Sequence, residues 1–443
     1  MLPILAGILL CLTGCFFKSV DELYAIPKSS ETYVNLQEKI KEVKGNAEYI
    51  APQSGTNTQI IQMVDLNGDG IQEAVAFFRD STAEKPLKIC IFKQNAKGNY
   101  EVFAWIEGAG TEIESIEYRN LTGNSDSEIL VSWKVSAGVH TLVAYSVSYG
   151  QVAELMRSGY TDCVTADVDG DGQDEILLAQ LDSSNPFSNR VELYDSDGGY
   201  LEMRSSAPLS EGIQDVTDWK VGTLAGSVPG LFVTGVLETG GRITDIFSLD
   251  KDTLRNVSID KETKQSTGTV RYYNGVEPTD IDKDGITEVP LCQAISITGS
   301  TNSSETFWKV QWWQYDAKGV RHLDMTTYHN NTDHWYLVLP ESWNGVITLS
   351  RRENSAIGER AVVFSYWNGD KKTEPDSFLT IYQLTGSNRT IRSKLNNRFT
   401  LCANSEAIYA AEFADCTWNC GLDQQGLTER FHLINNAWLL EDK

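Results

Sequence analysis

The sequence predicts a mainly β fold, in which a long array of repeated β units is followed by a small α+β domain. Short runs rich in Val, Ile, Phe and Tyr, separated by Gly, Asn, Asp and Ser, fill the chain after residue 45, and this pattern is typical of strands joined by turns. A nine-residue acidic segment recurs among these runs. A short β unit cannot bury its faces alone, so a repeated unit is expected to stack on its own copies.

The residues before this array predict a signal peptide and a membrane anchor. Residues 1–14 form an apolar run that is too short to cross a bilayer as a helix and has the length of a signal-peptide core. The sequence LTGC at residues 12–15 resembles the lipobox of bacterial lipoproteins. The resemblance implies that Cys15 is the lipid-modified first residue of a protein held at the cell membrane, facing the extracytoplasmic side. No Lys or Arg precedes the run, so we expect the start codon to lie upstream.

Residues 15–45 predict a polar tether followed by one short helix. Leu36, Ile40 and Val43 fall at positions i, i+4 and i+7, which places them on one face of a helix from Glu31 to about Lys44. Lys and Glu residues occupy the opposite face. The helix is therefore expected to be amphipathic.

The acidic segment has three complete copies and two eroded copies. The complete copies span residues 65–73, 167–175 and 280–288, and the eroded copies span residues 120–128 and 222–230. Successive copies start 47 to 58 residues apart. A period near fifty residues with about four strands per unit is typical of the blades of a β-propeller. We therefore expect residues 46–334 to form a β-propeller of about five four-stranded blades.

The complete copies have the ligand pattern of a calcium loop, DxDxDGxxE, with Asn at position 3 of the first copy. Calcium takes six to eight oxygen ligands, and carboxylates two residues apart on a tight turn point inward. Positions 1, 3, 5 and 9 would supply side-chain oxygens, and position 7 its main-chain carbonyl. The expected ligands are Asp65, Asn67, Asp69, Ile71 and Glu73 in the first loop, Asp167, Asp169, Asp171, Gln173 and Glu175 in the second, and Asp280, Asp282, Asp284, Ile286 and Glu288 in the third.

An EF-hand shares this opening, but it places a bidentate Glu at position 12 and lies between two helices. Position 12 is Ala76, Leu178 or Leu291 here, and the flanking residues have strand patterns, so the EF-hand interpretation fails. Over about residues 50–330 the arrangement resembles the FG-GAP loops of integrin-type propellers and of bacterial VCBS repeats. The resemblance implies about three structural calcium ions, with the two eroded copies as metal-free turns.

Residues 335–443 predict a separate α+β domain, because the acidic segment does not recur there. A helix is expected from about Asp423, with Leu427 and Phe431 on one side, followed by a last strand through Trp438. The expected strands before that helix are residues 346–349, 361–367, 378–382, 399–401 and 408–411.

The sequence contains no nucleophile elbow, no His-Glu-x-x-His motif and no phosphate-binding Gly loop. We therefore expect a non-catalytic binding, adhesion or scaffold module, whose ligand is a protein or a glycan and which meets the membrane through its lipid anchor. The formal net charge of −24 repels phosphate backbones, which excludes nucleic acid as a partner. The six cysteines after Cys15 are scattered, and we expect most of them to be buried thiols.

Two alternatives of other classes remain open. The chain can be an extracellular polysaccharide lyase or glycosidase, for which a cluster of residues such as His140, His322, His329 and His334 would have to converge. It can also be a structural spacer that presents residues 335–443.

Overall fold

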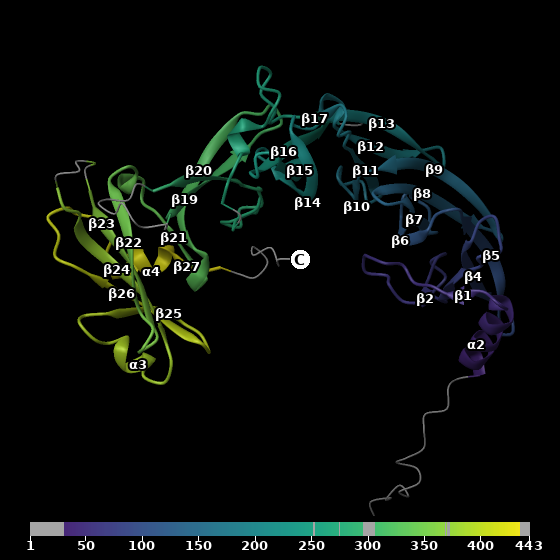
Figure 1. The fold of residues 1–443 in the computed structure, drawn as a ribbon, viewed down its shortest axis with the longest axis horizontal. Helices are drawn as coiled ribbons and strands as arrows, with labels where there is room; N and C mark the ends of the chain where they lie inside the picture. Colours follow the sequence, from purple (N-terminus) through teal and green to yellow (C-terminus); the bar gives the residue numbers. More distant parts are fainter. Residues whose placement is uncertain are drawn as a thin grey trace, which may run out of the picture. The chain divides into compact units, whose positions relative to one another are not determined.

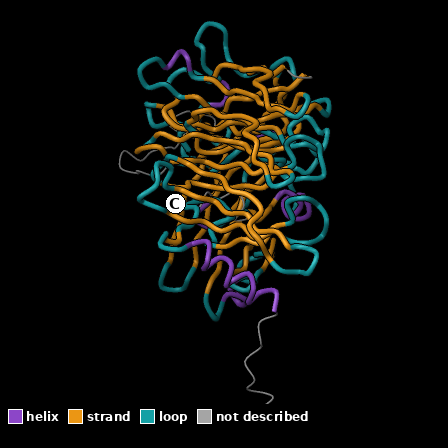
Figure 2. Tube along the Cα trace, turned by 90° about the vertical axis from the view of Figure 1, so that its right-hand side faces the viewer, coloured by secondary structure: helices purple, strands orange, loops and turns teal. Residues whose placement is uncertain are grey.

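A computed structural model describes residues 31–250, 253–273, 275–295, 306–367, 369 and 373–434. The predicted signal peptide, Cys15 and Trp438 lie outside these residues. The described chain divides into two compact units, the first of residues 1–118, 125–137 and 144–154 and the second of the remaining residues. Strands dominate both units and helices are few (Figure 2), so the chain is mainly β as predicted.

The described residues form six sheets of four or five strands (Figure 1). In sheets 2, 3 and 4 the strands follow one another in sequence, as in a propeller blade, whereas in sheet 1 both β1 and β2 pair with β3. The strands of sheet 1 are β1 (Glu48–Tyr49), β2 (Ile61–Val64), β3 (Glu73–Arg79), β4 (Leu87–Gln94) and β5 (Tyr100–Gly108); those of sheet 2 are β6 (Glu112–Arg119), β7 (Glu128–Ser136), β8 (Val139–Ser148) and β9 (Gln151–Tyr160).

Sheets 3 and 4 continue the same four-stranded pattern. The strands of sheet 3 are β10 (Asp162–Ala166), β11 (Glu175–Gln180), β12 (Arg190–Asp197) and β13 (Tyr200–Pro208); those of sheet 4 are β14 (Ile213–Leu224), β15 (Val228–Leu237), β16 (Arg242–Asp250) and β17 (Thr253–Asn256). Neighbouring strands in both sheets are antiparallel. A shared core that includes Leu177, Val191, Val233 and Phe247 packs these two sheets together.

Sheets 5 and 6 contain the remaining strands. Those of sheet 5 are β18 (Val289–Ala294), β19 (Trp308–Tyr315), β20 (Arg321–Asn330), β21 (Trp335–Val338) and β27 (Phe431–Leu433); those of sheet 6 are β22 (Ile347–Asn354), β23 (Glu359–Tyr366), β24 (Asp376–Thr385), β26 (Ala407–Phe413) and β25 (Phe399–Ala403). The described helices are α2 (Glu31–Lys44), α3 (Arg389–Arg392) and α4 (Gln424–Arg430).

Helix α2 has the bounds that the sequence predicts. Its apolar face is buried, with Leu36 and Ile40 only 2% and 1% exposed, and it packs against Phe78 and Phe92 of sheet 1. The Asn35 side chain accepts a hydrogen bond of 2.7 Å from the Tyr100 amide of β5. The helix therefore covers the first sheet. Within the described residues, no helix is both long and apolar enough to span a membrane.

The predicted boundary at residue 335 coincides with the first residue of β21, which pairs with β20 on one side and with β27 on the other. Sheet 5 therefore contains strands from both sides of that boundary. One core cluster also joins sheets 5 and 6, and it includes Trp335, Leu337, Phe364 and Phe378. The sequence predicted that Phe431 lies in the last helix, and this prediction is wrong. Helix α4 ends at Arg430, and Phe431 begins β27.

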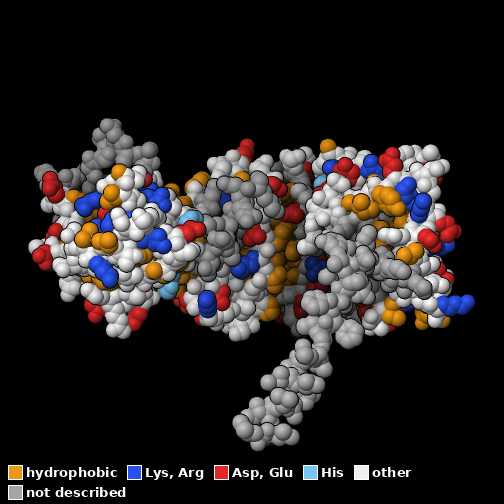
Figure 3. Space-filling view, turned by 90° about the horizontal axis from the view of Figure 1, so that it is seen from below, with side chains coloured by type: hydrophobic (Ala, Val, Ile, Leu, Met, Phe, Trp, Pro, Cys, Tyr) orange, Lys and Arg blue, Asp and Glu red, His pale blue; other side chains and the backbone are white. Residues whose placement is uncertain are grey.

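Acidic and basic side chains are interspersed over the face shown in Figure 3. Several form ion pairs between strands, such as Lys88 with Glu107 at 2.5 Å and Lys134 with Glu112 at 2.8 Å. Exposed pairs of this kind contribute about 0–1 kcal/mol each. These pairs therefore add little stability, and they leave the net charge of −24 unchanged.

Trp343 is the central side chain of the cluster between sheets 5 and 6. It is 1% exposed, its ring packs edge-on to Phe378 at 4.9 Å, and its Nε1 donates a 2.8 Å hydrogen bond to the Cys420 carbonyl. We predict that Trp343→Ala lowers the free energy of unfolding by about 3–5 kcal/mol. Ile391→Ala, at a side chain 66% exposed, should change it by less than about 0.5 kcal/mol. Urea denaturation of both variants checks this, and equal effects would contradict the shared core.

Candidate metal centres

The three complete acidic loops occupy the same place in their sheets. The first loop (residues 65–73) joins β2 to β3, the second (167–175) joins β10 to β11, and the third (280–288) leads into β18. In each loop the residue before position 1 pairs with the Glu at position 9. These pairs are Val64 with Glu73, Ala166 with Glu175, and Thr279 with Glu288. Each loop is therefore the closed end of an antiparallel pair.

Two hydrogen bonds fix the shape of every complete loop. The amide at position 2 donates to the buried Glu at position 9, at 2.9 Å for Leu66, 2.8 Å for Val168 and 2.9 Å for Ile281. The amide of the position-6 Gly donates to the Asp at position 1, at 2.8, 3.0 and 3.0 Å. These glycines have φ values of 82°, 91° and 91°, which is the region that residues other than Gly rarely adopt. The backbone thus turns the acidic side chains inward.

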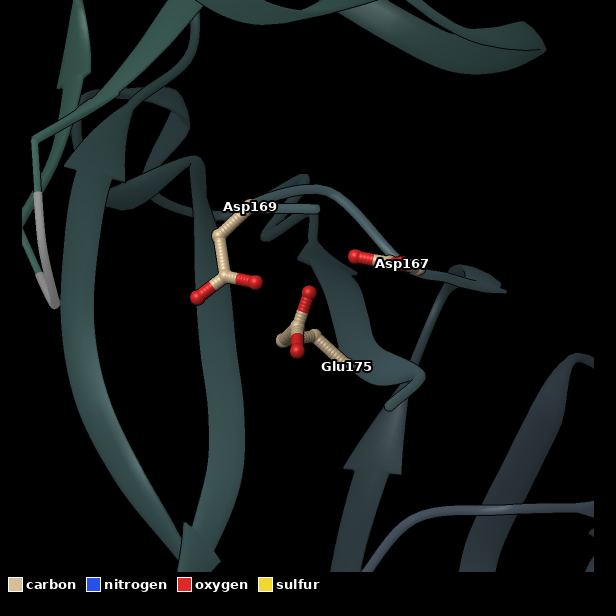
Figure 4. A group of neighbouring side chains, drawn as sticks. All are labelled: Asp167, Asp169 and Glu175. Atoms are coloured by element: carbon tan, nitrogen blue, oxygen red, sulfur yellow. The ribbon is translucent and has the colours of Figure 1, made fainter. Parts of the chain in front are cut away.

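The second and third loops each bring three carboxylates together. Oxygens of Asp167, Asp169 and Glu175 lie within 4.8 Å of one another, and their carboxylates point toward a common space (Figure 4). Asp280, Asp282 and Glu288 form the same arrangement in the third loop. These residues stand at positions 1, 3 and 9. The described structure therefore contains two Asp-Asp-Glu clusters that can hold a metal ion.

Burial makes these clusters costly without a cation. Glu175 is 2% exposed, and its Oε1 has no hydrogen-bond partner. Burial, the charges of Asp169 and Asp195 and then that of Asp171 raise the pKa of Glu175 to about 8. Burial likewise raises the pKa of Glu288 to about 7. A buried carboxylate oxygen without a partner among other carboxylates fits a hard, oxygen-binding cation such as calcium.

The predicted ligands at position 5 do not belong to the two converging carboxylate groups of the described structure. Asp171 accepts hydrogen bonds from the Gln173 amide at 2.8 Å and from Gln173 Nε2 at 2.9 Å. Asp284 accepts one from the Ile286 amide at 2.8 Å. These side chains brace the turn between positions 5 and 7. Their role as ligands, like that of the carbonyls at position 7, stays a prediction.

The first loop differs from the other two. Its predicted ligand Asn67 donates from Nδ2 to Glu73 Oε1 at 3.0 Å. In addition, Lys93 Nζ of β4 lies 3.6 Å from both Asp69 Oδ2 and Glu73 Oε1. The sequence pattern gave no indication of Lys93, because it lies 20 residues beyond the loop and reaches it only through strand pairing.

The eroded copies keep the position of the loop but lack its acidic residues at positions 1, 3 and 5, although the first of them retains Glu128 at position 9. Residues 120–128 connect β6 to β7, and the Asn120 side chain accepts a 3.0 Å hydrogen bond from the Gly123 amide. Residues 222–230 form the tip of the β14–β15 hairpin, with Gly222 opposite Gly230. Both copies therefore serve as turns between neighbouring strands.

Hydrogen bonds join successive copies of the segment. The position-8 amides of Ser127, Asp174 and Thr287 donate to the carbonyls of Leu66, Asn120 and Thr223 in the preceding copy, at 2.7, 2.8 and 2.9 Å. Gly222 permits one of these approaches, because a Cβ there would lie 2.3 Å from Thr287 Oγ1. The fourth copy has Pro229 at position 8, which has no amide hydrogen to donate.

One of the four histidines that the enzyme alternative requires to converge lies in the core. His329 of β20 is 4% exposed and stacks on Tyr336, with ring centroids 5.2 Å apart. Burial lowers the pKa of His329 to about 3, so this imidazole is neutral and packs within sheet 5. The six cysteines after Cys15 are free thiols, of which Cys90 and Cys420 are buried and the others partly buried.

No protein-family model matches the chain, and no curated protein matches it. Among solved structures it is similar to the exotype rhamnogalacturonan lyase YesX and to the rhamnogalacturonan lyase YesW, with 14% sequence identity and a TM-score of 0.29 in both cases. Both matches cover 71% of this chain, and they cover 61% of YesX and 59% of YesW. A TM-score this low carries no argument about the activity of this chain.

We predict that the protein freed of divalent cations loses stability as the pH rises from about 5 to about 8. The pKa values of Glu175 and Glu288 are raised in the folded chain, so these groups keep their protons at a pH where the unfolded chain has released them. Raising the pH therefore favours the unfolded state. Urea denaturation at pH 5, 6.5 and 8 after treatment with a chelating resin measures the slope.

Glu175→Gln, which cannot ionise, should make this slope shallower, whereas saturating calcium should abolish it. Stability that rises with pH in the metal-free protein would contradict the predicted burial of these carboxyl groups.

Proposed function

We propose that this chain is an extracytoplasmic, lipid-anchored β-propeller, stabilised by structural calcium, that acts as a non-catalytic binding, adhesion or scaffold module. The observation that carries the proposal is the repeated placement of converging carboxylates at the end of an antiparallel strand pair. Loops of this type, at the same place in sheets 1, 3 and 5, are what the resemblance to FG-GAP and VCBS repeats implies. In this proposal sheets 1 to 5 correspond to the five predicted blades, and the described part of residues 335–443 outside β21 and β27 forms an additional α+β region.

Calcium has a structural role in this proposal. Extracellular calcium modules bind with a Kd of about 10⁻⁴ to 10⁻³ M. At about 1 mM calcium and a Kd of about 10⁻⁴ M, each site adds about 1.4 kcal/mol by mass action. Two sites would then add about 3 kcal/mol, against a typical net stability of about 5–15 kcal/mol. Calcium would therefore keep the loops, and any ligand surface built on them, in one conformation.

The binding role is tested on a glycan and extracellular-matrix array with purified residues 16–443. We predict retention of one ligand class at 1 mM calcium and a loss of about tenfold or more in the metal-free protein, since the acidic loops then lose their fixed form. Glu175→Gln should bind more weakly at limiting calcium. The Ile391→Ala variant, altered far from the loops in sequence, serves as a matched control.

Turnover of a polysaccharide on the same array, detected as new unsaturated or reducing ends, would instead support the lyase or glycosidase alternative. Absence of both binding and turnover would favour the spacer alternative.

The anchor is tested by Cys15→Ser in a chain expressed with a complete signal peptide in a bacterium. We predict that the variant moves from the membrane fraction to the soluble fraction, because one Cys carrying two or three acyl chains is what attaches such a protein firmly. Cys11→Ser, within the predicted signal peptide, is the matched control and should remain membrane-bound. Equal retention of both variants in the membrane fraction would contradict the lipobox interpretation.

A further inference from the structure

Strand pairing places one residue beside the position-9 Glu of each complete loop. In all three sheets the residue after that Glu lies opposite an aromatic residue of the neighbouring strand. These pairs are Ala74 with Phe92, Ile176 with Tyr194 and Val289 with Trp313. The next residue along the partner strand therefore lies opposite position 9. That residue is Lys93 in the first loop, Asp195 in the second and Gln314 in the third. We call it the facing residue.

The facing residue gives the three loops different charges. The Lys93 ammonium lies 3.6 Å from the carboxylates of both Asp69 and Glu73. It occupies the side of the loop where those two carboxylates meet, and it is held over the Phe103 ring at 5.6 Å. The first loop thus has an internal cation, and its position-3 residue, Asn67, is neutral.

The second loop has the opposite charge at this place. Strand register places Asp195 opposite Glu175, so the facing position adds an acidic residue here, and Asp195 Oδ1 accepts a 2.5 Å hydrogen bond from the Ser196 amide. The buried Glu175 Oε1 has no hydrogen-bond partner, and the Glu175 carboxylate points toward the space that it shares with Asp167 and Asp169 (Figure 4). An additional acidic residue beside an unsatisfied buried oxygen is unfavourable unless a cation binds all of them.

The third loop is intermediate. Gln314 Nε2 donates to Asp284 Oδ2 at 3.0 Å and to Glu288 Oε1 at 2.9 Å. An amide satisfies part of the negative charge without neutralising it, and its own oxygen is a ligand that calcium accepts.

We propose that the facing residue determines which loops bind a divalent cation: the Lys93 ammonium takes the place of the ion in the first loop, whereas Asp195 is an additional ligand in the second. This inference rests on the proposed calcium-stabilised function. The protein then binds two calcium ions with unequal affinity, and the second loop is the tighter site, because ligand charge increases calcium affinity. The first loop keeps its form in the absence of calcium.

The test exchanges the charges of the facing residues in the full chain. Calcium per chain is measured by atomic emission after dialysis at 1 mM calcium chloride, and affinities by isothermal titration calorimetry. We expect two ions in the wild type, three in Lys93→Asp and one in Asp195→Lys. Lys97→Asp and Glu238→Lys, which make the same charge changes at exposed positions away from the loops, should retain two ions.

Milder variants cover the case in which a charge reversal prevents folding. Lys93→Gln makes the first loop resemble the third and should also gain an ion. Asp195→Asn should keep the fold, as judged by circular dichroism, and weaken the tighter site by about tenfold or more.

The two levels of inference fail differently. In the first case the wild type binds calcium, and the Lys93 and Asp195 variants bind the same number of ions per chain. That result would overturn the role of the facing residue alone. No bound calcium in any variant would overturn the proposed calcium function itself, and the facing-residue proposal with it.

Discussion

The hydrogen bond from one copy of the acidic segment to the preceding copy is the constraint on which the rest of the arrangement depends. It requires an amide hydrogen at position 8 and a carbonyl at position 1 or 2 of the preceding copy. Three of the four neighbouring pairs of copies form it, and the third and fourth copies do not, because Pro229 stands at position 8 of the fourth. The loop has to hold one backbone shape to do so. That shape is provided by the two bonds within the loop, from the position-2 amide to the Glu and from the position-6 Gly to the Asp. The backbone connection between neighbouring copies includes eroded copies, and therefore does not depend on a complete set of metal ligands.

Building that shape from acidic side chains has an electrostatic cost, because it brings several carboxylates close together. Carboxylates are good acceptors for the loop amides, but their convergence leaves oxygens such as Glu175 Oε1 buried and unsatisfied. In the first and third loops a group from a neighbouring strand offsets this cost, an ammonium in one case and an amide in the other, whereas the second loop faces Asp195. The eroded copies avoid the cost by omitting most carboxylates, and Asn120 provides the turn-forming acceptor instead.

The sequence predicted what local patterns encode. Helix α2, the strands beside the acidic segments and the inward-facing positions 1, 3 and 9 all follow from spacing within about ten residues. The position of Lys93, Asp195 and Gln314 beside the loops could not be predicted. It depends on the register between paired strands, which the spacing of residues within one strand does not give. The connection of β21 to β27 was missed for the same reason, since it joins residues about 100 positions apart, and a strand of three residues has no recognisable period.

Under the proposed role of the facing residue, the pattern of acidic residues predicts more cation sites than the chain has. A motif records which side chains can be ligands, whereas occupancy depends on the summed charge that surrounds them. Lys93 and Asp195 occupy the same register position with opposite charges, so two loops with nearly identical motifs have different requirements for a cation. Because the backbone of the loop is fixed independently, a substitution at the facing position can change the need for metal without changing the fold. Loss of metal dependence in one copy is thus compatible with retention of the bonds that link it to its neighbours.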